Sequence, residues 1–283
     1  LFLGFFCISF SVWLYPKVFH TEAMIKKNSD ILPNQTVYVD FDFPVLTNNY
    51  QGSMSVFPKI IADFSWEQDN KRLAIIPRNF WNPESSYSIE LPEGRSVALT
   101  KISSANVQFS TIKYPKVISF IPQNETKDVV LDIEDPIVVD FDKSTKEFFI
   151  KFSIDPESEM GYKNNAEKTQ FRIIPKDDMS SQERAGKKYT VTILAKYAKD
   201  TDDNFKQIYQ SYFSTLPPAP KVWEKDLSLR LDQARKFTKP QILENKYIDI
   251  NLVTQIMSMF ENGKLLDSYL ISSGKRGMDT PKG

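Results

Sequence analysis

The stretch that decides the fold reads Val-Tyr-Val-Asp-Phe-Asp-Phe at positions 37–43. Its apolar residues alternate with Tyr38, Asp40 and Asp42, which is the period-two pattern of a β-strand with one buried face and one wet face. The motif Val-Asp-Phe-Asp at 39–42 returns at 139–142, one hundred positions later. We therefore expect two copies of one β-rich module.

Further motifs repeat in the same order and at nearly the same spacing. They are Ile-Ile-Pro at 75–77 and 173–175, Tyr-Ser-Ile at 87–89 with Tyr-Thr-Val at 189–191, Phe-Ser-Thr at 109–111 and 213–215, and Pro-Lys-Val at 115–117 and 220–222. A period near 100 residues is that of a domain rather than a solenoid turn. Short strands with turn signals between them predict an all-β fold of two tandem immunoglobulin-like sandwiches, at 34–114 and 115–218.

Composition narrows the function classes. Lys plus Arg and Asp plus Glu each number 36 in 283 residues, so the net charge is zero and nucleic-acid binding has no electrostatic support. The single Cys and single His exclude a disulfide within the chain and a Cys/His zinc cage. A Ser-His-Asp triad would have to use His20, which directly follows the apolar N-terminus, so this chemistry is disfavoured.

The N-terminal residues predict a membrane segment. Leu1 to Tyr15 is almost purely apolar, with no charge before Lys17. A bilayer span needs about 20 apolar residues and a signal h-region about 7–15. We interpret residues 1–16 as an uncleaved signal anchor or transmembrane segment; a removed signal peptide and a buried core helix are the alternatives. Cys7 follows Phe6 rather than a small residue, so it is read as an apolar thiol and not a lipidation site.

The two copies resemble the bacterial Ig-like modules of cell-surface proteins over residues 34–218. The residues that carry this resemblance are Phe-Asp-Phe-Pro-Val at 41–45, Phe-Ser-Trp at 64–66, Ile-Pro at 76–77, the closing Phe-Ser-Thr, and the polar turn at 199–204. The first copy lacks that Asp-rich turn, and the second has a longer loop around 155–168. The resemblance implies modules that space, stiffen and sometimes bind.

Acidic residues supply two weak candidate sites within these modules. The first is a Ca²⁺ site at Asp200, Asp202 and Asp203, for which a solvated Asx turn is the alternative. The second is an acid–base pair at Asp40 and Asp42 or at Asp140 and Asp142, for which a solvated sheet face is the alternative. We favour the structural reading for both.

A joint follows the modules at 219–240. Pro217, Pro218 and Pro220 form a stiff spacer, and the spacing of Leu227, Leu231 and Ala234 predicts a short connecting helix within 223–237. Strands are then expected at 247–252, 255–260 and 265–271. Asn262-Gly263 predicts a type I′ hairpin turn between the last two of these strands.

The C-terminal stretch carries a second resemblance. Its motifs are Lys-Tyr-Ile-Asp-Ile-Asn-Leu at 246–252, Met-Phe-Glu-Asn-Gly-Lys-Leu at 259–265, Tyr-Leu-Ile-Ser-Ser-Gly at 269–274 and Thr-Pro-Lys-Gly at 280–283. In this order they resemble the N-terminal part of the L,D-transpeptidase catalytic domain, which cross-links bacterial peptidoglycan. The sequence departs from the family at Val253-Thr254-Gln255, where Ser-Lys-Gln is usual, and at Lys282, where Thr is common. Neither position carries the reaction.

The second resemblance implies acyl transfer between stem peptides by a Cys in a Ser-x-Gly-Cys motif with a nearby His. Both would lie beyond Gly283, so no residue here is assigned a catalytic role and the chain by itself is expected to be inactive. No metal or cofactor is implied. Because a few strands alone bury little, residues 246–283 are expected to be loosely held without the rest of that domain.

The sequence therefore predicts a membrane-anchored protein of the bacterial cell envelope, acting in peptidoglycan biosynthesis, wall biogenesis and cell shape, with stem peptides as its partners. A non-catalytic surface adhesin or scaffold is the alternative. A third reading is an intracellular β protein whose N-terminus is a core strand. Oligomeric state and the preferred acyl donor stay open.

Overall fold

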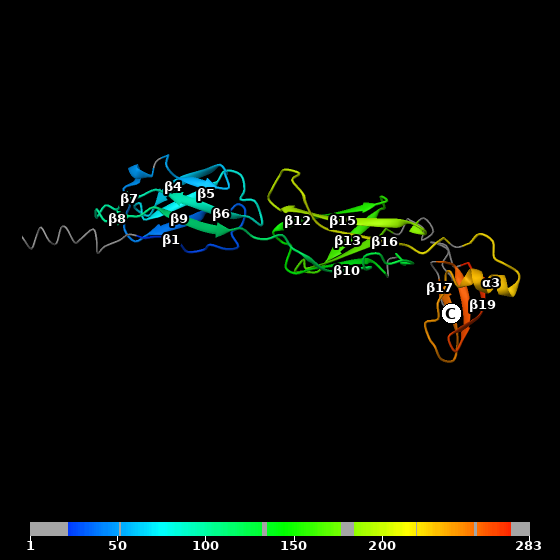
Figure 1. Cartoon of the computed structure of the whole chain (residues 1–283). Helices are drawn as coiled ribbons and strands as arrows, with labels where there is room; N and C mark the ends of the chain where they lie inside the picture. Colours follow the sequence, from blue (N-terminus) through cyan, green and yellow to red (C-terminus); the bar gives the residue numbers. More distant parts are fainter. Residues whose placement is uncertain are drawn as a thin grey trace, which may run out of the picture. The chain divides into compact units, whose positions relative to one another are not determined.

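The computed structural model describes residues 22–50, 52–131, 135–176, 184–218, 220–251 and 254–272. Over these residues the chain is nearly all β, built of antiparallel sheets (Figure 1). It divides into two compact units, one of residues 1–114 with 199–202 and one of the remainder. No helix among the described residues is long and apolar enough to cross a membrane, and the predicted anchor at 1–16 lies outside them.

The first unit contains a module of two sheets, ordered β1-β2-β5-β4 and β3-β6-β9. The strands are β1 (Ala23–Ile25), β2 (Val37–Phe41), β3 (Ser55–Phe57), β4 (Ala62–Glu67), β5 (Arg72–Pro77), β6 (Ser86–Leu91) and β9 (Ala105–Ser110). The connections carry the 3-10 helix η1 (Thr47–Asn49) and a small hairpin of β7 (Gly94–Arg95) and β8 (Lys101–Ile102).

The core of this module lies between its two sheets because each strand has one apolar face. On β2, Val37, Val39 and Phe41 are buried, whereas Tyr38 is exposed, as the alternating sequence predicts. The facing sheet contributes buried residues from β6 and β9, among them Ile89. Burying an aliphatic or aromatic side chain of this size stabilises the fold by about 1.5–3 kcal/mol.

The second unit begins with a module of the same design, whose sheets are ordered β10-β11-β14-β13 and β12-β15-β16. The strands are β10 (Val117–Ile121), β11 (Ile137–Phe141), β12 (Phe148–Asp155), β13 (Met160–Asn164), β14 (Gln170–Pro175), β15 (Lys188–Tyr197) and β16 (Lys206–Ser214). Residues from both sheets again share one buried core, which includes Val139, Ile173, Val191 and Phe213.

The two modules share one strand order. Numbered along the chain, strands one, two, five and four form one sheet and strands three, six and seven the other, which is the A-B-E-D and C-F-G arrangement of constant-type immunoglobulin sandwiches. Four of the five repeated motifs lie on equivalent strand pairs, and Pro-Lys-Val at 115–117 and 220–222 does not. The pairs are β2 with β11, β5 with β14, β6 with β15, and β9 with β16. The repeat in the sequence is therefore a repeat of strand order.

An aromatic corner supports the sixth strand of the first module. Tyr87, at the start of β6, accepts a hydrogen bond at its hydroxyl from the backbone N–H of Asn82 (2.9 Å), as in the tyrosine corner of immunoglobulin domains. Its ring stacks on Phe109 with centroids 5.3 Å apart. In the second module Tyr189 stacks on Phe213 at 5.6 Å, which are the equivalent positions.

The rest of the second unit is a three-stranded sheet with a helix against it. The helix α3 (Leu227–Ala234) contacts the sheet of β17 (Lys246–Asn251), β18 (Ile256–Glu261) and β19 (Lys264–Leu270), which are adjacent in chain order. The helix lies within the predicted span of 223–237, and the side chain of Asp226 caps its start by accepting from the backbone of Leu229 (3.1 Å).

The connecting helix is found where the sequence predicts it, and one expectation about a connection is corrected. The predicted connecting helix packs on the C-terminal sheet, where Ala234 joins Phe260 and Leu265 in a small core. The segment 155–168, expected as a longer loop, contains β13, which pairs with β14 along its whole length. Alternation in β13 is weak because most of its residues are exposed, so the sequence pattern did not reveal it.

We predict that Ile75→Ala destabilises the first unit by about 2–5 kcal/mol, because the Ile75 side chain is 0% exposed and its removal leaves a cavity in the shared core. Its neighbour Ile76 is 40% exposed on the other face of β5, so Ile76→Ala should cost less than about 1 kcal/mol. Urea denaturation followed by the fluorescence of Trp66 and Trp81 measures both. Equal losses in the two variants would contradict the assigned register.

Candidate functional site

The C-terminal sheet contains the motifs that resemble the transpeptidase domain. Lys246 pairs with Glu261 and Asn251 with Ile256, so β17 and β18 are antiparallel along their whole length. Glu261 pairs with Lys264 across a two-residue turn in which Asn262 and Gly263 both have positive φ, 48° and 75°. These are the angles of a type I′ turn, which confirms the predicted hairpin.

An ion pair fastens α3 to the edge strand of this sheet. The Arg230 guanidinium donates two hydrogen bonds to the Asp267 carboxylate on β19, at 2.8 and 2.9 Å, and both side chains are about 85% buried, with 14% and 15% exposed. The hydroxyl of Tyr269 donates a third bond to Asp267 (2.5 Å). Arg230 also donates to the backbone carbonyl of Lys225 at the start of the helix (2.7 Å).

This arrangement changes the acidity of Asp267. The Arg230 guanidinium, aided by Tyr269 and the backbone N–H of Ser268, outweighs burial and lowers the pKa of Asp267 to about 2. Asp267 is therefore a carboxylate at all physiological pH values, held by donors that stabilise its charge. Its role is to fix the helix on the sheet rather than to move protons.

Packing completes the helix–sheet contact. The indole N–H of Trp223, just before α3, donates to the backbone carbonyl of Ser268 (2.8 Å). Phe260 is buried on the helix side of the sheet, and Tyr247 stacks on it with centroids 5.1 Å apart. The sheet thus has a core of its own, which three strands alone would not provide.

The opposite face of the same sheet carries exposed apolar side chains beside Asp267, which pairs with Met259. Alternation puts Ile248, Ile250, Met257 and Met259 together, because Ile248 pairs with Met259 and Ile250 with Met257. Ile248 and Ile250 are 58% and 54% exposed, and Tyr269, which pairs with Met257, is 41% exposed. Three of these apolar side chains, Ile248, Ile250 and Tyr269, are thus exposed close together on one face.

No residue of the chain has a catalytic assignment to test against this geometry. Cys7 and His20 lie outside the described residues, as does the motif stretch 273–283. The family's Cys and His have no counterpart at any position that the resemblance covers. What the described residues of this region do is hold the sheet and its helix in one geometry.

The paired carboxylates of the two modules hold their sheets together. Asp40 accepts from Arg72 on the next strand (2.6 Å), and the Arg72 guanidinium lowers the pKa of Asp40. Asp140 accepts at the equivalent place from Gln170 (2.8 Å). Asp42 accepts from the backbone N–H of Glu22 and Asp142 from that of Lys116. These bonds serve strand register, and none resembles an acid–base site.

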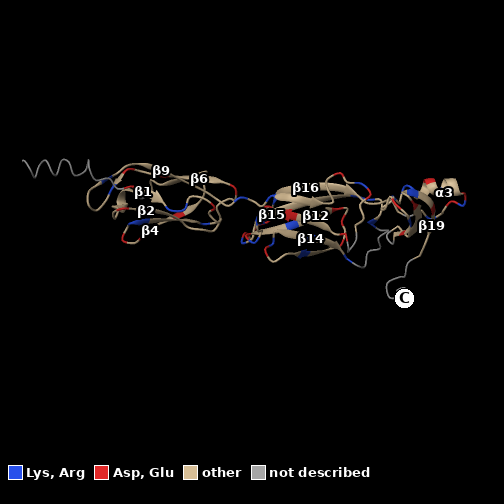
Figure 2. Ribbon diagram, turned by 90° about the horizontal axis from the view of Figure 1, so that it is seen from below, with Lys and Arg blue, Asp and Glu red and all other residues tan. Residues whose placement is uncertain are grey.

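The acidic turn of the second module forms an Asx turn. The backbone N–H of Asp202 donates to the Asp200 carboxylate (2.9 Å), and Asp203 lies 3.8 Å from the ammonium of Lys196. Across the part of the chain that the structure describes, no group of three His, Cys, Asp or Glu side chains is placed to hold a metal ion. Figure 2 shows basic and acidic residues interspersed on both modules.

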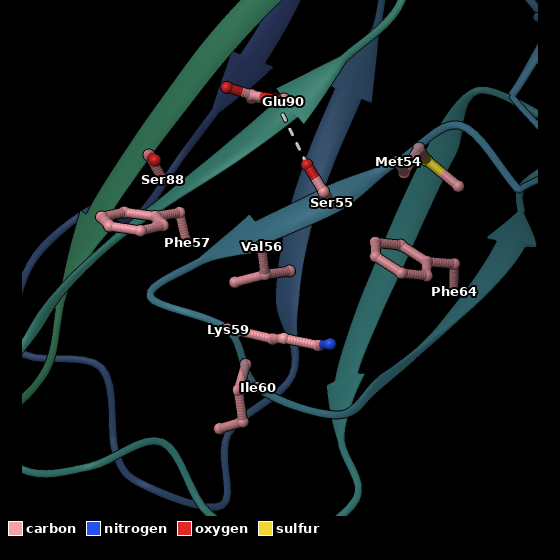
Figure 3. A pocket seen from close by; sticks show the side chains of 9 residues that line it. All are labelled: Met54, Ser55, Val56, Phe57, Lys59, Ile60, Phe64, Ser88 and Glu90. Carbon is pink, nitrogen blue, oxygen red and sulfur yellow. Dashed lines mark hydrogen bonds between the residues drawn. The ribbon is translucent and has the colours of Figure 1, made fainter.

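The sequence interpretation missed a pocket in the first module. It has a volume of about 500 Å³ and lies beside β3 and the β3–β4 connection. It is lined by Met54, Ser55, Val56, Phe57, Lys59, Ile60, Phe64, Ser88 and Glu90 (Figure 3). The available signal was the apolar run Phe57-Pro58-Lys59-Ile60-Ile61, interrupted by a single cation between two short strands.

Another buried group without a catalytic role lies in the same module. Tyr50 is fully buried against Phe41 and Trp66, and burial raises the pKa of its phenol to about 12. Its hydroxyl lies so close to the backbone of Gly94 that a Cβ there would be 2.6 Å from it. The phenol is thus a packed core group, neutral at physiological pH.

No protein-family model and no curated protein matches the chain. Solved structures that match include the N-terminal part of the bacterial S-layer protein SbsC, at 13% identity over 73% of this chain and 47% of that one, with a TM-score of 0.30. L,D-transpeptidase 3 from Mycobacterium tuberculosis matches at 17% identity over 42% and 44% of the two chains, with a TM-score of 0.22.

An L,D-transpeptidase from Mycobacterium smegmatis matches at 12% identity over 69% of this chain and 86% of its own, with a TM-score of 0.25. The chain spans less than half the length of the matched S-layer and Mycobacterium tuberculosis chains. At these identities and scores the likenesses carry no argument about family or activity.

We predict that Asp267→Asn loosens α3 from the C-terminal sheet, because it leaves the largely buried Arg230 without its counter-charge. The pKa of Asp267 is lowered in the folded state, so its contribution is present above about pH 4 and is lost as the pH falls towards 2. The lowering of the Asp267 pKa corresponds to about 2 kcal/mol of folding free energy at neutral pH.

Hydrogen exchange of the amides in 256–270, normalised to intrinsic rates between pH 2 and 7, measures this loss. The matched control is Asp232→Asn, because Asp232 forms an exposed pair with Arg235 on the same helix, and such pairs contribute about 0–1 kcal/mol. If these amides were as well protected in the Asp267→Asn variant as in the unchanged chain at pH 7, the ion pair would not be what holds the helix.

Proposed function

We propose that this chain belongs to a bacterial cell-envelope protein that acts in peptidoglycan biosynthesis or remodelling by L,D-transpeptidation. In this proposal residues 1–16 anchor the protein in the membrane, and the two sandwich modules at 34–114 and 115–218 carry the C-terminal domain outside the cytoplasm. Residues 246–283 form the beginning of that catalytic domain. Residues 219–240 connect it to the modules.

The observation that carries the proposal is the fold of residues 246–270. The motif run that resembles the transpeptidase domain forms three consecutive antiparallel strands with a type I′ turn at Asn262 and Gly263. One face of this sheet is covered by α3, and the other exposes Ile248, Ile250 and Tyr269. A sheet with one face covered and one apolar face exposed is what the first strands of a larger domain would present.

The resemblance implies the following chemistry. A thiolate attacks the carbonyl that follows the L-centre of the diamino acid in one stem peptide, and the D-alanine amine leaves with a proton. The amine of a neighbouring stem then attacks the thioester and releases the thiol. A His takes and returns the proton, and backbone amides hold the oxyanion. The residues of this chain orient the domain, and none makes or breaks a bond.

The proposal predicts that the gene product carries, after residue 283, a His and a Ser-x-Gly-Cys motif within about 100 residues, the size of an ordinary domain. It also predicts exchange of a free D-amino acid into purified tetrapeptide muropeptides by that gene product. Replacing the motif Cys by Ser should abolish the exchange, because the thiolate is the nucleophile.

Residues 1–283 alone are the matched control and should give no exchange product by mass spectrometry. Turnover by this control would show that the nucleophile lies elsewhere. A reading frame without the motif, or exchange that survives the Cys→Ser change, would also overturn the proposal.

A non-catalytic scaffold or adhesin is the second candidate, and the tandem modules favour it. Both have the strand order of immunoglobulin sandwiches, an architecture common in cell-surface domains. Such a protein would sediment with isolated peptidoglycan or a partner without any cysteine-dependent activity. The exchange assay above separates the two candidates.

A further inference from the structure

The pocket of the first module lies at the corner where its two sheets meet. Val56 on β3 is buried towards the core, whereas Ser55 and Phe57 on the same strand point to the outer face of the sheet. All three line the pocket. Because side chains of both faces border one hollow, the hollow runs along the edge of β3 itself, and the strand's main chain is part of its wall.

That edge of β3 is free for pairing. β3 ends its sheet, in the order β3-β6-β9, and among the described residues its only strand partner is β6, from Ser55 with Glu90 to Phe57 with Ser88. An edge strand presents main-chain N–H and C=O groups that an extended peptide can pair with. Phe57, which is 71% exposed, stands next to this edge without cover.

The lining of the pocket is mostly apolar and includes one basic and one acidic side chain. Figure 3 shows Glu90 and Lys59 on opposite sides of Val56, with Ile60 on the side of Lys59 and Phe64 level with Val56. Glu90 accepts a hydrogen bond from the hydroxyl of Ser55 (3.3 Å). A carboxylate entering the pocket is repelled by Glu90 and attracted by Lys59, so the charges set one orientation for an elongated ligand.

We propose that the free edge of β3 and the hollow beside it bind a short, extended peptide with a free carboxyl terminus. The peptide adds a strand to β3, its terminal carboxylate meets the ammonium of Lys59, and an apolar side chain packs against Val56, Ile60 and Phe64. The volume of about 500 Å³ lies within the usual 300–1,000 Å³ of small-ligand sites, which suits a few residues.

This site is separate from the proposed transpeptidase domain and does not require its chemistry. Stem peptides of the wall are short peptides with a free carboxyl terminus, so under the proposed function they are the natural occupants. That last identification rests on the proposed function, whereas the peptide site itself does not. The two can therefore fail independently.

The test is a titration of the full chain, with labelled methyl groups, by acetylated tetrapeptides. The panel varies the last residue among Ala, D-Ala, Val and Leu, and each peptide is made as the free acid and as the C-terminal amide. The methyl groups of Met54, Val56 and Ile60 report on the pocket, and those of Ile173 and Val191 in the second module serve as internal references.

We expect saturable shifts at Met54, Val56 and Ile60 with at least one free acid, and a dissociation constant on the order of 1 mM. Lys59→Met should weaken the binding of that free-acid peptide about fivefold, which is the effect of losing one exposed charge pair. The binding of the corresponding amide peptide should not change. The matched control is Lys101→Met, which removes an exposed lysine of the same module that pairs with Glu93 (3.0 Å). This control should alter the affinity for neither the free-acid peptide nor the amide peptide.

Binding by strand addition also makes a prediction about the peptide backbone. Only every second amide N–H of the peptide faces β3, so N-methylation of those amides should abolish binding, whereas N-methylation of the alternate amides should not. Absence of saturable shifts with every free acid would overturn the proposal. So would equal binding of acid and amide, equal effects of Lys59→Met and Lys101→Met, or shifts confined to the second module.

Discussion

The structure depends first on the period-two alternation of β2 and β11. Every second residue of each strand enters the core, and a register slip of one residue would put Tyr38 and Asp40 inside the first module. The outer face fixes the same register independently, because Asp40 pairs with Arg72 and Asp140 with Gln170 at directly opposed positions. Burial and polar pairing thus specify one alignment of the second and fifth strands. In each module the facing sheet packs on the buried face that this alignment creates.

The C-terminal part buries its apolar side chains between a helix and a sheet rather than between two sheets. Its described residues form one sheet and no second sheet that faces it, and α3 covers one side through Ala234, Phe260 and Leu265. This core is small, and polar contacts supplement it: the Arg230–Asp267 pair and the bond from Trp223 to the backbone of Ser268. Both contacts reach β19, the strand at the sheet's edge. These contacts hold a helix of only eight residues against the sheet.

The sequence predicted those features that follow from local pattern. Alternation located β2 and β11, the repeated motifs marked equivalent strands, and Asn262-Gly263 determined the last turn, because in each case neighbouring residues decide the geometry. Contacts between distant residues could not be read in this way. Arg230 and Asp267 are 37 positions apart, in a chain with many other basic and acidic residues. The β3 pocket depends on which strand ends a sheet, and strand order across a sheet is a tertiary property.

The two modules also show that the pocket is not a necessary result of their common fold. At the equivalent corner of the second module, Phe152 on β12 stacks on Tyr162 of β13 with ring centroids 5.6 Å apart, and Phe171 packs against the Phe152 ring at 5.5 Å. Three aromatic rings thus occupy that corner. In the first module Met54, just before β3, takes the position of Phe152, Phe64 on β4 takes that of Tyr162, and the connection between the two strands supplies a lysine. The open corner of the first module, with a cation in its wall, therefore lacks aromatic packing that the second module has, and the proposed peptide site is a reason for that difference.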